Sequence, residues 1–236
     1  MTPKRTRPTV AIDGPAGAGK STVTRLVAER LDYLLVDTGA LYRAVALAAE
    51  RARVAWEDHA SVVELAERLA REHALGLERA ADDGIKVLLD GEDVSAAIRT
   101  LEIGQGASKV SAIPGVRDAL LELQRSLGRE GGVVMEGRDI GTVVFPDAEA
   151  KFFLTASVEV RARRRYEELV QRGQTIGFAE VCREVEERDE RDRTRPVAPL
   201  CKAEDALEID SSDISIDEVV ERIVTAVRSV ERALAR

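Results

Sequence analysis

The segment Gly14-Pro15-Ala16-Gly17-Ala18-Gly19-Lys20-Ser21 decides the fold of this chain. It fits the pattern G-x-x-x-x-G-K-[ST], in which glycines allow backbone N–H groups to surround phosphate oxygens. The apolar run at residues 9–12 is typical of a buried strand, and an amphipathic helical pattern follows at residues 21–31. A strand, a glycine-rich turn and a helix in this order predict a phosphate-binding loop, which we call the phosphate loop (residues 14–21).

The phosphate loop predicts how a nucleoside triphosphate binds. We expect its backbone N–H groups and the positive end of the following helix to bind the phosphates. Lys20 is expected to place its charge on the β and γ phosphates, and Ser21 to bind Mg²⁺ together with water and ATP oxygens. The predicted ATP-binding residues in this segment are Gly14, Pro15, Ala16, Gly17, Ala18, Gly19, Lys20, Ser21 and Thr22.

Composition argues against several other classes of protein. A net charge of −8 and an aromatic content of 3% disfavour a nucleic-acid-binding surface. No window of about 18 apolar residues is present, so we expect no membrane span. Cys182 and Cys201 have neither metal-ligand spacing nor the pattern of a disulfide framework, and no targeting signal precedes the first strand. We therefore expect a cytoplasmic monomer with two free thiols.

Strands and helices alternate along the chain, which predicts an α/β fold with a doubly wound, five-stranded parallel sheet. The five strands are expected at residues 9–12, 33–36, 133–136, 150–154 and 206–210. Between residues 74 and 96 the pattern changes, because two short strands there are separated by an Asp82-Asp83-Gly84 turn. This predicts a small antiparallel insert. The last helix should bury an apolar stripe of Ile216, Val219, Val220, Ile223, Val224 and Val227.

Arginines are concentrated in two helices expected at residues 157–172 and 178–193, where we predict a helical lid. Two clusters each have the spacing of one helix face: Arg161, Arg164 and Arg165, and then Arg188, Asp192 and Arg195. Guanidinium groups bind phosphate oxygens in pairs and suit the charge of a transferred phosphoryl group. The interleaved glutamates are equally compatible with surface ion pairs. Because a phosphate loop is present, we favour phosphate chemistry for the second cluster.

Other segments carry a more specific pattern. They are Ile12-Asp13-Gly14-Pro15, Asp37-Thr38-Gly39-Ala40-Leu41-Tyr42-Arg43, Gly91-Glu92-Asp93-Val94-Ser95 with Ile98-Arg99, Gly137-Arg138-Asp139-Ile140-Gly141-Thr142-Val143-Val144-Phe145-Pro146, Glu187-Arg188-Asp189-Glu190-Arg191-Asp192-Arg193, Arg195, and Val197-Ala198-Pro199-Leu200. In these segments the chain resembles the bacterial cytidylate kinases, which are nucleoside monophosphate kinases. The resemblance extends over nearly the whole chain.

The resemblance implies transfer of the γ-phosphoryl group of ATP to CMP and dCMP, with Mg²⁺ as cofactor. The implied CMP-binding residues are Arg43, Arg138 and Arg195 for phosphate, Ser108, Arg117 and Asp139 for cytosine, Arg188 and Asp192 for ribose, and Thr38 and Tyr42 in the acceptor pocket. The implied catalytic residues are Lys20, Arg138, Arg188 and Arg195, and Arg161 of the lid is implied to bind ATP. A carboxylate beside an arginine suits the amino group and ring acceptors of cytosine.

The resemblance also implies a division into domains. Residues 1–73 and 97–236 would form the kinase core, with a lid at about 157–193, and residues 74–96 would form a monophosphate-binding subdomain. Thr38 stands where relatives have serine, which leaves the fine substrate preference open.

Three alternatives remain. The chain could be a kinase that acts on another monophosphate or on shikimate, or an ATP-dependent regulatory or chaperone subunit. A GTPase switch is disfavoured, because its guanine-reading motif needs an asparagine and the chain has none.

Overall fold

The structure is a computed structural model that describes residues 6–79, 85–171 and 173–236. The predicted turn at Asp82–Gly84 lies outside these residues. The chain divides into two compact units. We call the unit formed by the residues up to Leu34 together with Glu130–Arg236 the core unit, and the unit formed by Leu35–Arg129 the second unit.

The large sheet has five strands in the order β2-β6-β1-β7-β8. Their bounds are β1 Thr9–Asp13, β2 Leu34–Asp37, β6 Val133–Gly137, β7 Ala150–Thr155 and β8 Leu207–Asp210. β1 pairs in parallel with β6 on one side and β7 on the other, and β7 pairs in parallel with β8. The predicted α/β fold with a five-stranded parallel sheet is therefore confirmed. The strand order reverses at β1, and ligands of open α/β sheets bind beyond the strand ends at such a point.

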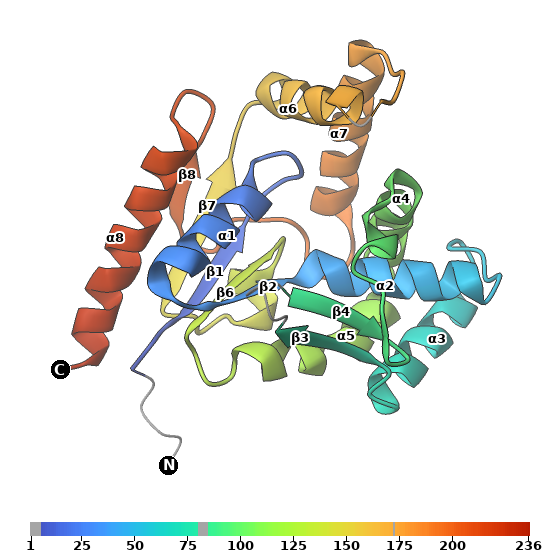
Figure 1. Cartoon of the computed structure of the whole chain (residues 1–236), viewed down its shortest axis with the longest axis horizontal. Coiled ribbons are helices and arrows are strands. Elements are labelled where there is room, and N and C mark those ends of the chain that lie inside the picture. Colours follow the sequence, from blue (N-terminus) through green and yellow to red (C-terminus); the bar gives the residue numbers. More distant parts are fainter. Residues whose placement is uncertain (1–5, 80–84, 172) are drawn as a thin grey trace. The chain divides into compact units, whose positions relative to one another are not determined.

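Two helices of the core unit are held in place by their apolar faces. α1 (Lys20–Leu31) and α8 (Ile216–Leu234) pack against each other (Figure 1). Five of the six predicted stripe residues of α8 are buried, but Ile216 is 49% exposed. Ile216 is the first residue of the helix, so its side chain extends beyond the stretch that packs on the sheet.

The predicted lid consists of two helices that pack together, α6 (Val158–Gln171) and α7 (Phe178–Thr194) (Figure 1). Arg195 lies just past the end of α7 and does not continue it, although its backbone N–H still donates to the Arg191 carbonyl. After β6, two residues without regular structure lead into a single π-helical turn at Ile140–Val144, for which we had no expectation from the sequence.

The second unit joins helices to a small sheet. Its elements are α2 (Thr38–Arg51), α3 (His59–Arg71), β3 (Leu75–Arg79), β4 (Ile85–Leu89), β5 (Glu92–Asp93), a 3₁₀ turn (Ala97–Arg99), α4 (Leu101–Val110) and α5 (Pro114–Gly128). The antiparallel sheet has the order β3-β4-β5, in agreement with the small insert predicted there. Leu75, Val87 and Leu89 of this sheet are buried in one hydrophobic cluster with residues of the helices. The compact unit is therefore larger than residues 74–96.

Among the described residues, no helix is both long enough and apolar enough to span a bilayer. The same residues contain no cluster of three or more histidine, cysteine or acidic side chains suited to a metal ion. Both cysteines are free thiols, as the sequence predicted.

Candidate functional site

The phosphate loop connects β1 to α1 in the core unit. Gly14 has a φ of +149°, and a Cβ atom there would lie 1.9 Å from the Leu154 carbonyl oxygen, so only glycine fits. Gly19 precedes α1 with a φ of 88°, and no side chain caps the helix. The first turn of α1 also contains no acidic residue. The N–H groups at this helix end are therefore left to an anion from solution.

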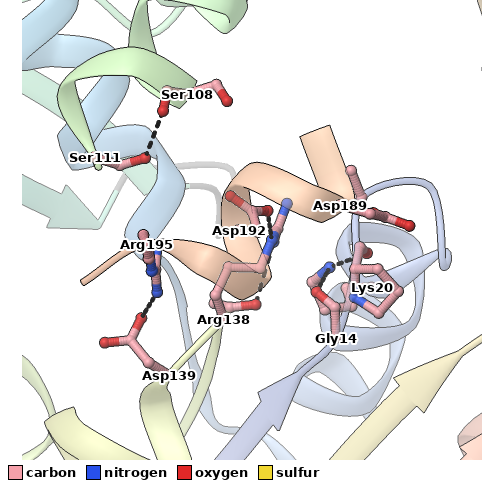
Figure 2. Close-up of polar contacts among 12 residues, drawn as sticks. Gly14, Lys20, Ser108, Ser111, Arg138, Asp139, Asp189, Asp192 and Arg195 are labelled. Atoms are coloured by element: carbon pink, nitrogen blue, oxygen red, sulfur yellow. Dashed lines mark hydrogen bonds and ion pairs between the residues drawn. The ribbon is translucent and has the colours of Figure 1, made fainter. Parts of the chain in front are cut away.

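Lys20 is buried inside the phosphate loop. Its Nζ donates to the carbonyl oxygens of Gly14 and Pro15, each at 2.7 Å (Figure 2). Burial and then the positive charges of Arg138 and Arg188 lower the pKa of Lys20 to about 7, although Glu136 opposes the shift. These couplings place Lys20 in the same electrostatic field as Arg138 and Arg188.

Ser21 and Glu136 bring together the oxygen atoms that could hold Mg²⁺. Ser21 Oγ donates to Glu136 Oε1 at 2.8 Å, and Thr24 Oγ1 donates to Glu136 Oε2 at 3.2 Å. Glu136 lies on β6, next to the strand that leads into the phosphate loop. Hydroxyl and carboxylate oxygens are ligands that Mg²⁺ accepts, usually with water and substrate phosphates completing its shell. The donor set therefore fits the predicted metal.

Two arginines of the core unit are paired with two buried carboxylates beside this loop (Figure 2). Arg138 Nε donates to Asp192 Oδ2 at 2.8 Å, and Arg195 Nη2 donates to Asp139 Oδ1 at 3.1 Å. Burial raises the pKa of Asp192, but the positive charges of Arg138 and then Arg188 hold it below its usual value. Asp192 therefore stays ionised and accepts hydrogen bonds only.

A carboxylate that we did not assign to the site anchors this segment. Asp13, the last residue of β1, accepts the N–H groups of Ile140 and Gly141, each at 2.8 Å. Burial raises the pKa of Asp13 to about 6, although the same two N–H groups lower it. Asp13 thus fixes the start of the π-helical turn and, with it, the preceding Arg138 and Asp139. The motif Ile12-Asp13-Gly14-Pro15 contained this residue but no sign of its partners.

The three arginines of the first cluster do not share one set of partners. Arg161 Nη1 donates to the Ala16 carbonyl oxygen at 3.1 Å, whereas Arg164 donates to the Ser211 hydroxyl and carbonyl oxygens. Arg165 pairs with Glu168 at 2.8 Å, one turn along the same helix. Both Arg161 and Arg164 therefore lie near the phosphate loop, while Arg165 makes the kind of local ion pair that the glutamates suggested.

The second unit holds the remaining predicted residues, and several of them contact one another. The Arg117 guanidinium lies 5.4 Å from the centre of the Tyr42 ring, and Arg117 Nη1 donates to the Ser111 carbonyl at 3.2 Å. Ser111 Oγ in turn donates to the Ser108 carbonyl at 3.3 Å. Three elements, α2, α4 and α5, thus bring Tyr42, Ser108 and Arg117 into one network.

The same unit shows two partners that the sequence did not reveal. Gln124, fully buried on α5, donates to the Tyr42 hydroxyl at 3.2 Å. Arg43 forms an ion pair with Asp37, which directly precedes α2. Thr38 is buried as the first residue of that helix. Only the apolar stripe of α5 could have indicated that position 124 is buried, and nothing in the sequence named its partner.

Packing also explains how α4 is held. A Cβ atom at Gly106 would lie 2.5 Å from the Trp56 ring, so glycine is required there. Trp56 Nε1 donates to the Ala46 carbonyl of α2 at 3.0 Å. The ring therefore fixes α4, which carries Ser108, against α2, which carries Tyr42.

Comparison with known proteins agrees with the sequence-based expectation. Residues 10–229 match the family model described as cytidylate kinase. The cytidylate kinases of Geobacter sp. (strain M21) and Geobacter sulfurreducens are 53% and 52% identical to this chain over 228 and 225 residues. These alignments cover 96% and 95% of this chain and 94% of each relative.

Similarity to solved structures is more distant. An uncharacterized protein from Eubacterium ventriosum superposes with a TM-score of 0.50 at 12% sequence identity. The match covers 94% of this chain and 99% of that chain. At this level of identity the likeness concerns the fold alone.

Proposed function

The chain belongs to the cytidylate kinase family, and we therefore propose that it transfers the γ-phosphoryl group of ATP to CMP and dCMP, giving CDP and dCDP. One observation of the structure supports this proposal above the others. The phosphate loop lies in the same compact unit as the pairs Arg138–Asp192 and Asp139–Arg195, and Lys20 is coupled electrostatically to Arg138, Arg188 and Asp192. This arrangement of charged side chains supports the transfer of a phosphoryl group from a triphosphate to an acceptor.

The proposed roles follow the chemistry of each side chain. Lys20 and the loop N–H groups hold the β and γ phosphates of ATP, and Arg138, Arg188 and Arg195 stabilise the charge that spreads over the transferred group. Asp192 accepts hydrogen bonds from ribose hydroxyls. From the family resemblance we also propose that Thr38, Tyr42, Arg43, Ser108 and Arg117 take part in CMP binding.

We propose Mg²⁺ as the cofactor, with Ser21 and Glu136 as the residues that would hold it. When bound, Mg²⁺ neutralises charge on the β and γ phosphates. An oxygen of the CMP phosphate attacks the γ phosphorus while the bond to the β–γ bridging oxygen breaks, so ADP leaves and no covalent enzyme intermediate forms. Closure of α6 and α7 as a lid would exclude water, which otherwise competes as acceptor. We also propose that the chain works as a cytoplasmic monomer.

A mixture of ATP and CMP followed by ³¹P NMR tests the proposal. Equal amounts of CDP and ADP should appear, with little inorganic phosphate. Release of phosphate without CDP would identify an ATPase instead.

The depressed pKa of Lys20 predicts proton uptake on nucleotide binding. Because the pKa is about 7 without nucleotide, Lys20 is largely neutral at a pH about one unit higher, and phosphate anions favour its charged form. ATP binding at that pH should take up close to one proton, and the affinity should fall as the pH rises above 7. Calorimetry in buffers of different ionisation enthalpy measures the uptake. Lys20→Ala should abolish it, and equal uptake in that variant would assign the proton to another group.

Substitution of Asp139 tests base recognition. Asp139→Ala should reduce kcat/KM for CMP about tenfold or more, because loss of a buried polar partner costs roughly 1–3 kcal/mol. The preference for CMP over UMP should fall as well, since the carboxylate is proposed to accept the cytosine amino group. The affinity for ATP should change by no more than a few fold. An unchanged CMP to UMP ratio would show that Asp139 supports Arg195 without reading the base.

A further inference from the structure

Arg161 and Asp189 form a buried ion pair next to the phosphate loop. Their side chains are 4% and 7% exposed, and Arg161 Nη2 lies 2.6 Å from Asp189 Oδ2. Arg161 is in the first turn of α6, and Asp189 is near the end of α7. The pair therefore joins the first turn of α6 to the last turns of α7.

Two further N–H groups of Arg161 donate to backbone carbonyls. Nε donates to the Ala156 carbonyl at 2.8 Å, and Nη1 donates to the Ala16 carbonyl of the phosphate loop at 3.1 Å. The loop also packs directly on Arg161, because a Cβ atom at Gly17 would lie 3.0 Å from the Arg161 Cβ. A guanidinium has five N–H groups, and these contacts together with the Asp189 pair use three of them, so they are compatible with the expected contact to ATP. Beyond that contact, Arg161 is placed to hold the loop.

Asp189 links the position of α7 to Arg161. It follows Arg188 directly and precedes Asp192 by one turn, and Figure 2 shows Asp189 and Asp192 on the same stretch of helix. Its second oxygen, Oδ1, is buried without a hydrogen-bond partner among the described residues. An unsatisfied buried carboxylate oxygen is costly, so its retention here calls for a purpose beyond packing.

We propose that Arg161 and Asp189 are a positioning pair, in which Asp189 on the acceptor-side helix α7 acts on ATP binding through Arg161 and the Ala16 carbonyl. This rests on the proposed function only for the identity of ATP as the ligand of the phosphate loop. A buried guanidinium that loses its carboxylate partner is left uncompensated and moves toward other acceptors or water. Arg161 would then release Ala16, and the loop N–H groups would lose their alignment with the phosphates.

A double-mutant cycle on ATP-analogue binding tests the pair. In the intact protein, Asp189→Asn should weaken binding of a nonhydrolysable ATP analogue about tenfold, as expected for loss of a charged, buried hydrogen-bond partner. The same substitution in an Arg161→Met background should change the affinity less than about twofold, since both residues act as one unit. Arg161→Lys, which keeps the charge but loses the planar fork, should fall between wild type and Arg161→Met.

Matched controls are available on the same two helices. Arg163→Met on α6 and Glu186→Gln on α7 remove exposed charges, so each should leave the affinity within about twofold. Amide hydrogen exchange of residues 14–19 gives a second readout that does not depend on affinity. Exchange there should rise in Asp189→Asn and stay unchanged in Glu186→Gln, while the thermal transition shows that each variant is folded.

The possible outcomes test the positioning pair and the proposed function independently. A folded Asp189→Asn with wild-type affinity for the analogue overturns the pair, and so does an equal loss in the Arg161→Met background. Wild-type protein that binds the analogue but leaves CMP unphosphorylated would contradict the proposed function without affecting the cycle.

Discussion

Lys20→Ala is expected to lower kcat by at least about a hundredfold, as found for other preorganised groups that stabilise charge in a transition state. The Lys20 amino group is buried in the phosphate loop, where it donates to two carbonyl oxygens at 2.7 Å. No other lysine or arginine lies within the loop sequence. Steady-state kinetics with saturating ATP and CMP measure the effect.

The fold should survive this substitution. Because the pKa of Lys20 is lowered from 10.5 to about 7 in the folded state, its ionisation opposes folding, fully below about pH 7 and less as the pH rises to 10.5. Removing Lys20 therefore loses no electrostatic stabilisation over that range. Lys202→Ala, which removes an exposed lysine paired with Glu208, is the control. A folded Lys20→Ala variant that keeps more than about a tenth of the wild-type rate would disprove the catalytic role.

Arg195→Lys is expected to reduce kcat/KM for CMP about tenfold or more, although it keeps the positive charge. Arg195 Nε donates to the Ala198 carbonyl at 2.6 Å while Nη2 donates to Asp139 at 3.1 Å, and its side chain is 3% exposed. A lysine has one nitrogen and cannot reproduce both directions. One of two buried acceptors would then lose its partner, and Asp139 would be displaced from the geometry proposed to read cytosine.

The matched control is Arg193→Lys. Arg193 lies at the end of α7 and is 60% exposed in its pair with Glu190. Exposed ion pairs contribute only about 0–1 kcal/mol, so this change should have little effect on kcat/KM. If Arg195→Lys behaves like Arg193→Lys, with a loss below about threefold, Arg195 acts only through its positive charge and its planar fork is not needed.

The phosphate loop and the parallel sheet could be predicted because each rests on a local pattern. Glycines at 14 and 19 are required by positive φ angles, and those requirements are visible in the sequence as a motif. The order of the strands could not be predicted, because pairing β1 with both β6 and β7 depends on contacts between residues far apart in the chain.

Side-chain partners were the main feature that the sequence did not contain. The spacing of Arg161, Arg164 and Arg165 predicted one common face, yet their guanidinium groups reach three different sets of acceptors. A face of a helix extends over a wide arc, and long side chains choose partners from whatever packs against it. In the same way, Arg195 was expected to continue the helix face of Arg188 and Asp192, but the helix ends at Thr194 and frees Arg195 to reach Asp139.

Two further features of the structure depend on contacts with residues far away in the sequence. The π-helical turn at Ile140–Val144 begins where Asp13 accepts two N–H groups, so a residue far away in the sequence decides it. The antiparallel sheet is part of a larger unit because its apolar face is buried by helices on both sides of it in the sequence. Neither the carboxylate partner nor the burying helices could be identified from residues 74–96 or 137–144 alone.

The most direct test of the account is the turnover of the purified chain with ATP and one acceptor at a time: CMP, dCMP, UMP, AMP and shikimate. The proposed function predicts that kcat/KM is highest for CMP and dCMP, because the Asp139 carboxylate complements the amino group of cytosine. Replacing the amino group by the carbonyl of uracil leaves a carboxylate facing an acceptor, so UMP should be used much less well. A kcat/KM for UMP, AMP or shikimate that equals or exceeds the value for CMP would contradict the central claim.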